Sequence, residues 1–453
     1  SGLSDSERLQ AWVDAKTGKA SIIIGTRSAI WTPLKNPGLF IVDEEHDLSY
    51  KQQDGLRYSA RDVAIMRGQL SKSPVLLGSA TPSAESLQNV QLEKFSLLTL
   101  NKRAGEANTP SIEIIDLRNR AMQGSVSQTL IHAIKKELSE KNQVMLFLNR
   151  RGYSPTIMCH HCGWIADCDR CDMHMTYHKR RNTLSCHHCD HQIALPNNCP
   201  ECNGEQLLEL GHGTERLTET LTECFPKARV LRIDRDSTRR KGSMELMINS
   251  INAGDADILI GTQMLAKGHH FPKLTLVGII DADGGLCSTD FRASERMAQL
   301  FVQVSGRAGR ANKPGTVMVQ THFPDHPLLK SLISNGYREF ANVLLQEREQ
   351  ANLPPFSYLA LLRSEAHHQH QTREFLQKAS VLLNQQGRQM EIFGPVPAPM
   401  EKRAGKIRMQ LLVQSNNRSL LRQAMHTWSM AIEKLPAAKK VRWSLDIDPQ
   451  DMM

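Results

Sequence analysis

The sequence lacks any apolar run long enough to cross a membrane. Its longest apolar stretches, such as residues 274–280, fall far short of the roughly 20 residues that a spanning helix needs. The first five residues, SGLSD, have neither the basic nor the apolar region of a signal peptide, and they contain no initiator methionine. From these absences we expect a cytoplasmic protein with no membrane partner, and a fragment of a longer chain.

The composition also lacks the biases that mark fibrous or disordered proteins. Hydrophobic residues make up 40% and charged residues 23% of the 453 residues, which excludes collagen-like, coiled-coil and wholly disordered chains. A chain of this length is expected to form about three domains. The net charge of +9 permits an anionic partner such as nucleic acid, although a solvated basic surface gives the same balance.

Buried strands alternate with helical segments through the first two thirds of the chain. This alternation predicts an α/β fold of two successive parallel-sheet units. After residue 324 the pattern of strand-like and helical segments changes, which predicts a separate α+β domain. The apolar runs that carry the prediction are 20–25, 38–42, 74–78, 144–148, 228–233, 256–260, 274–280 and 315–320. We place the domains at 1–115, 116–157 continued at 205–325, a Cys-rich insertion at 158–204, and 326–453.

Four polar residues, Asp43-Glu44-Glu45-His46, follow the apolar run that ends at Val42. The carboxyl ends of parallel strands form the ligand crevice of an open α/β sheet. There one carboxylate, Asp43, can hold Mg²⁺ and the next, Glu44, can polarise an attacking water. A solvated acidic loop is the alternative interpretation of these residues alone.

Other short motifs follow further strands or a helix, and their order along the chain is informative. They are Gly25-Thr26-Arg27-Ser28-Ala29, Gly78-Ser79-Ala80-Thr81-Pro82, Gly261-Thr262-Gln263-Met264-Leu265-Ala266-Lys267-Gly268 and Gln303-Val304-Ser305-Gly306-Arg307-Ala308-Gly309-Arg310. With the acidic box, this set resembles the ordered motifs of superfamily 2 helicases. The resemblance implies two RecA-like lobes, the first incomplete, with ATP and Mg²⁺ bound between them.

The resemblance also implies a role for each matching residue. Arg307 and Arg310 would stabilise charge on the γ-phosphate, whereas a surface salt bridge is the alternative for an isolated Arg pair. Glu45, His46, Gln303 and Gly268 would lie around the nucleotide, and Ser79 and Thr81 would couple it to DNA. Thr26, Arg27, Thr262 and Lys267 would contact the DNA backbone, which carries no sequence information.

Aromatic and cationic residues mix in the segment between the acidic box and Gly78. Tyr50, Lys51, Arg57 and Tyr58 lie close together in a predicted loop. Rings can stack on unpaired bases while cations hold phosphates, although an ordinary exposed loop is the alternative. The segment resembles the aromatic-rich loop that couples DNA binding to hydrolysis in RecQ-like and PriA-like helicases.

No Gly-x-x-x-x-Gly-Lys-Ser/Thr stretch occurs in the sequence, and Gly18-Lys19-Ala20 lacks both the first glycine and the hydroxyl. That motif supplies backbone N–H groups and a lysine to the phosphates. We therefore expect the chain to start past this motif and to hydrolyse almost no ATP by itself.

Eight of the ten cysteines form four Cys-x-x-Cys pairs, and this pattern predicts two closed Cys₄ zinc sites of structural type. The first and second pairs lie too close together to share an ion easily, so we favour nested connectivity over the cross-braced alternative. One ion would be held by Cys159, Cys162, Cys199 and Cys202, and the other by Cys168, Cys171, Cys186 and Cys189. Cys224 and Cys287 stand apart and are expected to be buried thiols.

The Cys-rich insertion, Lys267-Gly268-His269-His270-Phe271-Pro272 and the closing Val441–Pro449 together make the chain similar to the PriA family of primosomal replication-restart helicases. The resemblance implies a 3′-to-5′ DNA helicase that recognises stalled forks, with forked and single-stranded DNA, single-stranded DNA-binding protein, PriB and DnaT as partners. A non-catalytic zinc-stabilised scaffold and another superfamily 2 translocase are the alternatives.

Overall fold

The computed structural model describes residues 3–100, 110–148, 156–170, 174–178, 182–186, 191–209, 214–233, 237, 243–261, 265, 271–288, 290–309, 314–386 and 390–452. The chain forms two compact units, one made of residues 1–96 with 446–450 and the other of residues 97–445 with 451–453. No helix in these described ranges is long and apolar enough to cross a membrane.

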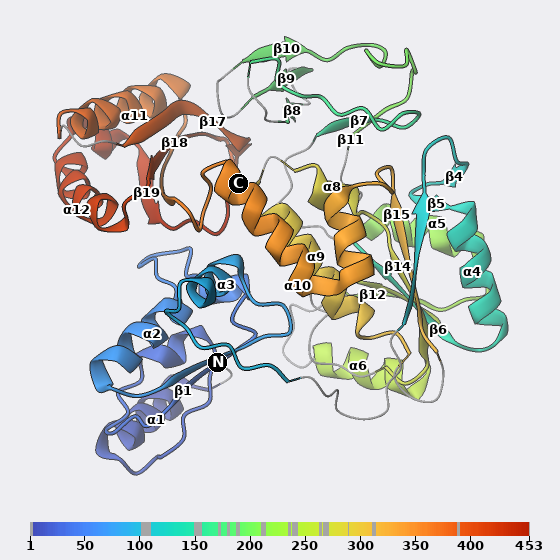
Figure 1. The fold of residues 1–453 in the computed structure, drawn as a ribbon, viewed down its shortest axis with the longest axis horizontal. Helices are drawn as coiled ribbons and strands as arrows, with labels where there is room; N and C mark the ends of the chain where they lie inside the picture. The colour runs from blue at the N-terminus through green and yellow to red at the C-terminus, as the bar shows by residue number, and fades with distance from the viewer. Residues whose placement is uncertain are drawn as a thin grey trace. The chain divides into compact units, whose positions relative to one another are not determined.

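The first unit is built around two parallel strands, β1 (Phe40–Asp43) and β2 (Val75–Gly78), with Asp43 level with Gly78. The helix α2 (Ala60–Ser71) connects them and packs on both (Figure 1). A Cβ on Gly68 of α2 would lie 2.2 Å from Val75 Cγ2, so only glycine permits this close approach. The other elements are α1 (Asp5–Thr17), η1 (Arg27–Trp31), η2 (Leu48–Tyr50) and α3 (Ala84–Gln91).

One strand predicted for this unit is absent from the structure. Residues 20–25 form no strand, and the side chains of Ile22 and Ile24 are 80% and 94% exposed. The prediction of a buried strand there was wrong, because an apolar run becomes a strand only where a neighbouring strand pairs with it.

The second unit contains a six-stranded, all-parallel sheet in the order β12-β13-β6-β14-β15-β3. Its strands are β3 (Ser111–Asp116), β6 (Gln143–Phe147), β12 (Val230–Ile233), β13 (Ile258–Gly261), β14 (Leu274–Ile279) and β15 (Thr316–Thr321). Every residue of β6, β13 and β14 is buried, as expected for central strands covered on both faces. The helices are α4 (Gln128–Ser139), α5 (Thr214–Cys224), α6 (Ser243–Ala253), α8 (Asp283–Leu286), α9 (Ala293–Ser305) and α10 (Pro327–Gln350), and β4 (Met122–Gln123) pairs with β5 (Val126–Ser127).

The edge strand β3 changes the first predicted domain boundary. It pairs in register with β15 from Ser111 to Asp116, so residues 111–115 belong to the second sheet and not to the first unit. Hydrophobic pattern identifies a strand but not the sheet it joins, which explains the difference from the predicted boundary after residue 115.

The Cys-rich segment folds as short antiparallel strands. β8 (Thr176–His178), β9 (Thr183–Ser185) and β10 (Gln192–Ala194) form one sheet, and β7 (Ile157–Cys159) pairs with β11 (Leu207–Glu209) at the two ends of the insertion. The β7–β11 pairing closes the insertion at its base, which agrees with an inserted module.

The C-terminal domain is a four-stranded sheet in the order β17-β18-β16-β19, with α11 and α12 on one face (Figure 1). Trp428, Phe375 and Leu411 are among the buried residues of the core between the helices and the sheet. The elements are β16 (Tyr358–Ala366), α11 (Gln369–Asn384), β17 (Glu391–Arg403), β18 (Lys406–Ser415), α12 (Arg418–Glu433), η3 (Pro436–Lys440) and β19 (Arg442–Ile447). The α/β class with a C-terminal α+β domain is therefore confirmed.

Candidate functional site

The acidic box lies where β1 ends. Parallel pairing places Asp43 beside Gly78, and the Glu45 N–H donates to the Gly78 carbonyl at 3.0 Å. The box and the Ser79–Thr81 motif therefore lie at the carboxyl ends of neighbouring strands, as the sequence predicts.

The carboxylates of the box differ in their surroundings. The side chain of Glu44 is 44% exposed, whereas that of Glu45 is 1% exposed. Asp43 is exposed, and its Oδ1 accepts the Glu44 N–H at 3.0 Å. Asp43 is thus open to a ligand at this edge of the sheet, whereas Glu44 is half-exposed and its Oε2 lies 3.6 Å from Nδ1 of His46. Carboxylate oxygens are the ligands that Mg²⁺ prefers.

Glu45 is held by the protein on both oxygens. Its Oε1 accepts the Ser83 N–H at 2.6 Å, and its Oε2 accepts from the Ser83 hydroxyl and from Arg61, both at 3.1 Å. Burial lowers the pKa of Arg61, but the nearby carboxylates of Asp62, Glu45 and Glu85 raise it by more than burial lowers it. The net pKa is therefore above its usual value, and the guanidinium stays charged. This environment fixes the start of α3 and differs from the nucleotide contact predicted for Glu45.

His46 connects the box to the motif after β2. Its Nδ1 lies 2.7 Å from Ser79 Oγ, and Ser79 Oγ also accepts the Thr81 N–H at 2.9 Å. Thr81 is fully buried. The predicted coupling residues Ser79 and Thr81 are therefore joined to the acidic box through one imidazole.

Tyr50 of the aromatic-rich loop lies against the box. Its hydroxyl donates to the Asp43 carbonyl at 2.7 Å. Burial raises the pKa of Tyr50, and the charges of Asp43 and Glu44 raise it further, so the hydroxyl remains a donor.

Lys51 is buried, unlike the exposed cation that the sequence predicts. Its Nζ lies 2.9 Å from Asp446 Oδ1 and donates to the carbonyls of Ile447 (2.6 Å) and Asp448 (3.2 Å). Both side chains of the ion pair are 6% exposed. Lys51 thus joins the loop to the last strand, and its surroundings do not favour the DNA contact predicted for it.

The remaining predicted DNA-binding residues of this unit surround the same loop. Arg27 donates to the carbonyls of Ser49 and Lys51, both at 3.0 Å, while Thr26 is exposed and Arg57 is partly buried. The ring of Tyr58 packs edge-on against Trp31, with centroids 5.1 Å apart. Sequence reasoning missed Trp31, although its position just after the Thr26-Arg27 motif was a usable signal.

In the second unit, Gln303 lies in the last turn of α9 and Arg307 in the turn that follows, and both are half-buried. The Gly309 N–H donates to the Leu274 carbonyl at 3.2 Å, which holds this turn at the start of β14. A Cβ on Gly315 would lie 2.4 Å from the Gly309 nitrogen, so glycine is needed there. Thr262, Lys267, Gly268 and Arg310 lie outside the described residues.

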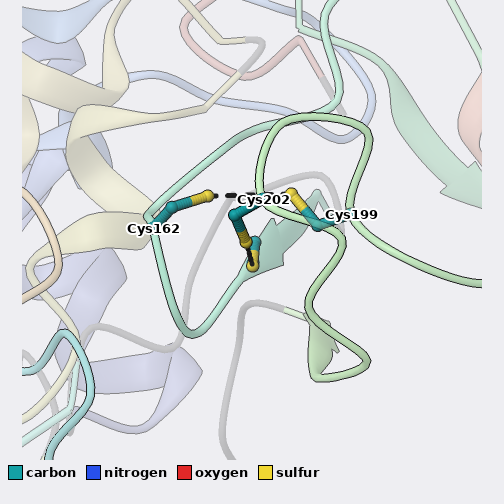
Figure 2. A group of neighbouring side chains, drawn as sticks. Cys162, Cys199 and Cys202 are labelled. Atoms are coloured by element: carbon teal, nitrogen blue, oxygen red, sulfur yellow. Dashed lines mark hydrogen bonds between the residues drawn. The ribbon is translucent and has the colours of Figure 1, made fainter.

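Two Cys-x-x-Cys turns form a thiol cluster from opposite ends of the insertion. In each turn the residue after the second cysteine is left-handed, Gly163 with φ 81° and Asn203 with φ 58°. Figure 2 shows the sulfurs of Cys162, Cys199 and Cys202 turned toward a common centre, and Cys159 completes the group.

The sulfur positions fit a tetrahedral zinc ion. The distances from Cys159 Sγ to Cys202 Sγ and from Cys162 Sγ to Cys199 Sγ are both 3.6 Å, and all four sulfurs lie within 4.8 Å of one another. Four Zn–S bonds of ~2.3 Å place sulfurs about 3.8 Å apart, whereas a disulfide needs about 2.05 Å. The described cluster contains the four cysteines that nested connectivity assigns to one ion.

Burial raises the pKa of Cys159 and raises that of Cys162 to about 12. A bound cation reverses this preference, because a coordinating thiol loses its proton. The four donors leave no open position, so a zinc ion here would be structural.

The other predicted site is described only in part. Cys168 and Cys186 are both buried in one apolar cluster with Met175 and Leu184, whereas Cys171 and Cys189 lie outside the described residues. Of the two isolated cysteines, Cys287 is buried and Cys224 is partly exposed.

Family models match the chain in four stretches. They are a DEAD/DEAH box helicase domain at residues 2–90, the PriA DNA helicase Cys-rich region domain at 168–193, a helicase conserved C-terminal domain at 192–312 and a primosomal protein N C-terminal domain at 349–450. The helicase, zinc-module and C-terminal assignments made from the sequence agree with these matches.

Curated relatives match along nearly all of the chain. Replication restart protein PriA of Haemophilus influenzae is 49% identical over 100% of the chain and 62% of that protein, and PriA of Bacillus subtilis is 38% identical over 100% and 57%. PriA of Rickettsia prowazekii is 38% identical over 96% of the chain and 67% of that protein. A RecG structure bound to a three-way DNA junction covers 77% of the chain and 36% of RecG at 14% identity and a TM-score of 0.41. The chain spans about three fifths of the length of the first two relatives, and it belongs to the PriA family of replication restart helicases.

Proposed function

We propose that this chain is the larger part of an ATP-driven 3′-to-5′ DNA helicase that restarts replication at stalled forks. The observation that carries the proposal is the pair of available carboxylates, Asp43 and Glu44, at the end of β1 beside the Ser79–Thr81 motif. The helicase family matches on both sides of the Cys-rich module support it.

In this proposal the predicted motif residues act on one bound nucleotide. Asp43 would hold the Mg²⁺ that accompanies the nucleotide, and Glu44 would accept the proton of the attacking water. Arg307 and Arg310 stabilise the charge that develops on the γ-phosphate. Ser79 and Thr81 pass the nucleotide state through His46 to the DNA-binding loop.

DNA is the proposed substrate, contacted by Thr26, Thr262 and Lys267 along its backbone and by Tyr50, Arg57 and Tyr58 at unpaired bases. Arg27 would support the loop, since it already binds two of its carbonyls. Single-stranded DNA-binding protein, PriB and DnaT are proposed as protein partners in the cytoplasm, as the family resemblance implies.

Two structural zinc ions complete the proposal. Cys159, Cys162, Cys199 and Cys202 would hold one, and Cys168, Cys171, Cys186 and Cys189 the other. The first set has the spacing of a tetrahedral site, and the burial of Cys168 and Cys186 in one cluster supports the second.

The test is the unwinding of a fork with a 3′ single-stranded arm by the full-length gene product, with ATP and with a non-hydrolysable analogue. We expect unwinding with ATP alone and DNA-stimulated ATP turnover. Fork binding without ATP turnover would contradict the motor and favour a zinc-stabilised scaffold.

The 453-residue chain itself is a useful control. It contains no Gly-x-x-x-x-Gly-Lys-Ser/Thr motif, so we expect negligible ATP turnover from it with or without DNA. Turnover at an ordinary helicase rate would contradict the assignment of phosphate binding to that motif.

A further inference from the structure

A chain of hydrogen bonds runs from the second sheet into the thiol cluster, and it uses no residue of the proposed motor. His322 follows β15, and its Nδ1 lies 2.7 Å from Asp283 Oδ2. On the other side of the ring, Nε2 lies 3.0 Å from Nδ1 of His160. Asp283 and His322 are 4% and 6% exposed, so their hydrogen bonds do not compete with bulk water.

Asp283 is the fixed end of this chain of hydrogen bonds. Its two carboxylate oxygens accept the backbone N–H of His322 at 3.0 and 3.2 Å, and the carboxylate also accepts from the Thr321 hydroxyl. Because the same carboxylate binds Nδ1 of His322, it fixes the ring orientation and directs Nε2 toward His160.

His160 is the end that lies in the zinc module. It stands between Cys159 and Cys162, and its backbone N–H donates to the Gln206 carbonyl at 3.0 Å. A Cβ on Gly163, which has φ 81°, would lie 3.4 Å from Phe323 Cε1 and 3.5 Å from the His322 carbonyl oxygen. The first knuckle, residues 159–163, therefore packs closely on the segment after β15.

At its other end, this chain of hydrogen bonds begins at Asp283, in the segment that continues through α8 and α9 to the turn containing Arg307. Asp283 begins α8 shortly after β14 ends at Ile279, and α9 follows and ends at the turn that contains Arg307. α9 has 13 residues and is about 20 Å long, and the turn after it is held at the start of β14 by the hydrogen bond from the Gly309 N–H to the Leu274 carbonyl.

We propose that Asp283, His322 and His160 are positioning residues that dock the first zinc knuckle on the second sheet and tie its position to helix α9, which ends just before Arg307. The docking is a property of the fold. Its consequence, that unwinding is coupled to ATP turnover through the knuckle, rests on the proposed function.

Docking can be tested in the 453-residue chain by amide hydrogen exchange of residues 157–166. His160→Ala removes the link from the module side. His322→Asn leaves a side-chain amide that can donate to Asp283 but is too short to reach His160. This variant therefore breaks the link to His160 without leaving the buried Asp283 carboxylate unpaired. We expect each variant to exchange about fivefold faster in this segment, the effect of one net hydrogen bond, and the double variant to add nothing further.

The zinc content separates docking from metal binding. It should equal that of the unmodified chain in both variants, and His132→Ala, an exposed histidine on α4, should change neither quantity. Unchanged exchange in His160→Ala, additive effects in the double variant or loss of zinc from His160→Ala would each overturn the docking role.

The coupling is measured in the full-length helicase. We expect His160→Ala to unwind several-fold fewer base pairs per ATP, while turnover on single-stranded DNA stays within about twofold. An unchanged ratio would overturn the coupling. Failure of the unmodified protein to hydrolyse ATP would instead overturn the proposed function and leave the exchange result standing.

Discussion

The acidic box and the thiol cluster both gather ionisable groups, but they arrange them differently. In the cluster the four thiols of Cys159, Cys162, Cys199 and Cys202 lie within 4.8 Å of one another, which leaves no position for a substrate. In the box, Asp43 is exposed and Glu44 is half-exposed beside His46, while the oxygens of Glu45 accept hydrogen bonds from Ser83 and Arg61. The comparison separates groups that build the structure from groups that remain available for chemistry, and adjacent residues can fall in different classes.

The largest expected effect is on the closed site. Cys199→Ser removes one of four ligands, and because structural zinc supplies about 10–16 kcal/mol of folding free energy in small zinc modules, we expect the chain to lose one bound zinc and the order of the knuckle. Zinc released per chain can be measured with a chelating dye. Cys224→Ser, which lies outside the cluster, should retain the full amount, and a Cys199→Ser chain with unchanged zinc would contradict the site.

The buried ion pair of Lys51 with Asp446 anchors the loop that lies against the acidic box, and Lys51→Met tests it. This change leaves Asp446 buried without its cation, and breaking a buried ion pair from one side costs about 3–5 kcal/mol. We expect easier urea unfolding of the first unit, followed by proteolysis, and partial recovery in Lys51→Met with Asp446→Leu. Lys19→Met, in an exposed pair, should have almost no effect, and an equal loss in both single variants would refute the role of burial.

A third test compares two aspartates that follow strands. Asp43 at the end of β1 is exposed, whereas Asp281, just after β14, is buried, and burial and the charge of Asp283 raise its pKa to about 6. A raised carboxyl pKa favours folding at low pH, and this contribution is lost as the pH rises from about 4 through 6. Asp281→Asn should therefore stabilise the second unit by about 2–3 kcal/mol at pH 7.5 and by almost nothing near pH 4. Unfolding curves at the two pH values measure this, and a constant difference would contradict it.

The smallest expected effect concerns Tyr50. Tyr50→Phe deletes only the hydroxyl that donates to the Asp43 carbonyl, so we expect a loss of about 0.5–1.5 kcal/mol in the stability of the first unit. Tyr58→Phe keeps the ring contact with Trp31 and is the matched control. Equal stability of Tyr50→Phe and the unmodified chain in urea would show that this bond does not hold the loop on the box.

The sequence predicts the parts of the molecule that depend on local pattern. The central strands β6, β13 and β14 follow from continuous apolar runs, and the nested grouping of Cys159 with Cys202 follows from the spacing of the pairs. Strand β17 is missed because Pro395, Pro397 and Pro399 are typical of a loop. It tolerates them as the edge strand of its sheet.

The local sequence pattern does not predict which residues far apart in the chain come into contact. Nothing near Lys51 indicates Asp446 almost the whole chain away, and nothing near His160 indicates His322. Lys51 was predicted as a DNA contact, because a side chain's charge does not reveal which distant segment will bury it.

The most direct test of the account is ATP turnover by the full-length protein carrying Glu44→Gln. The amide keeps the size of the side chain and cannot accept the proton of water, so we expect DNA-stimulated turnover to fall by about 10²–10⁴-fold with unchanged thermal stability and unchanged fork affinity. Glu93→Gln, an exposed glutamate of the same unit, should hydrolyse ATP normally. Turnover of Glu44→Gln within about twofold of the unmodified protein would contradict the claim that the open carboxylates of the box perform the chemistry.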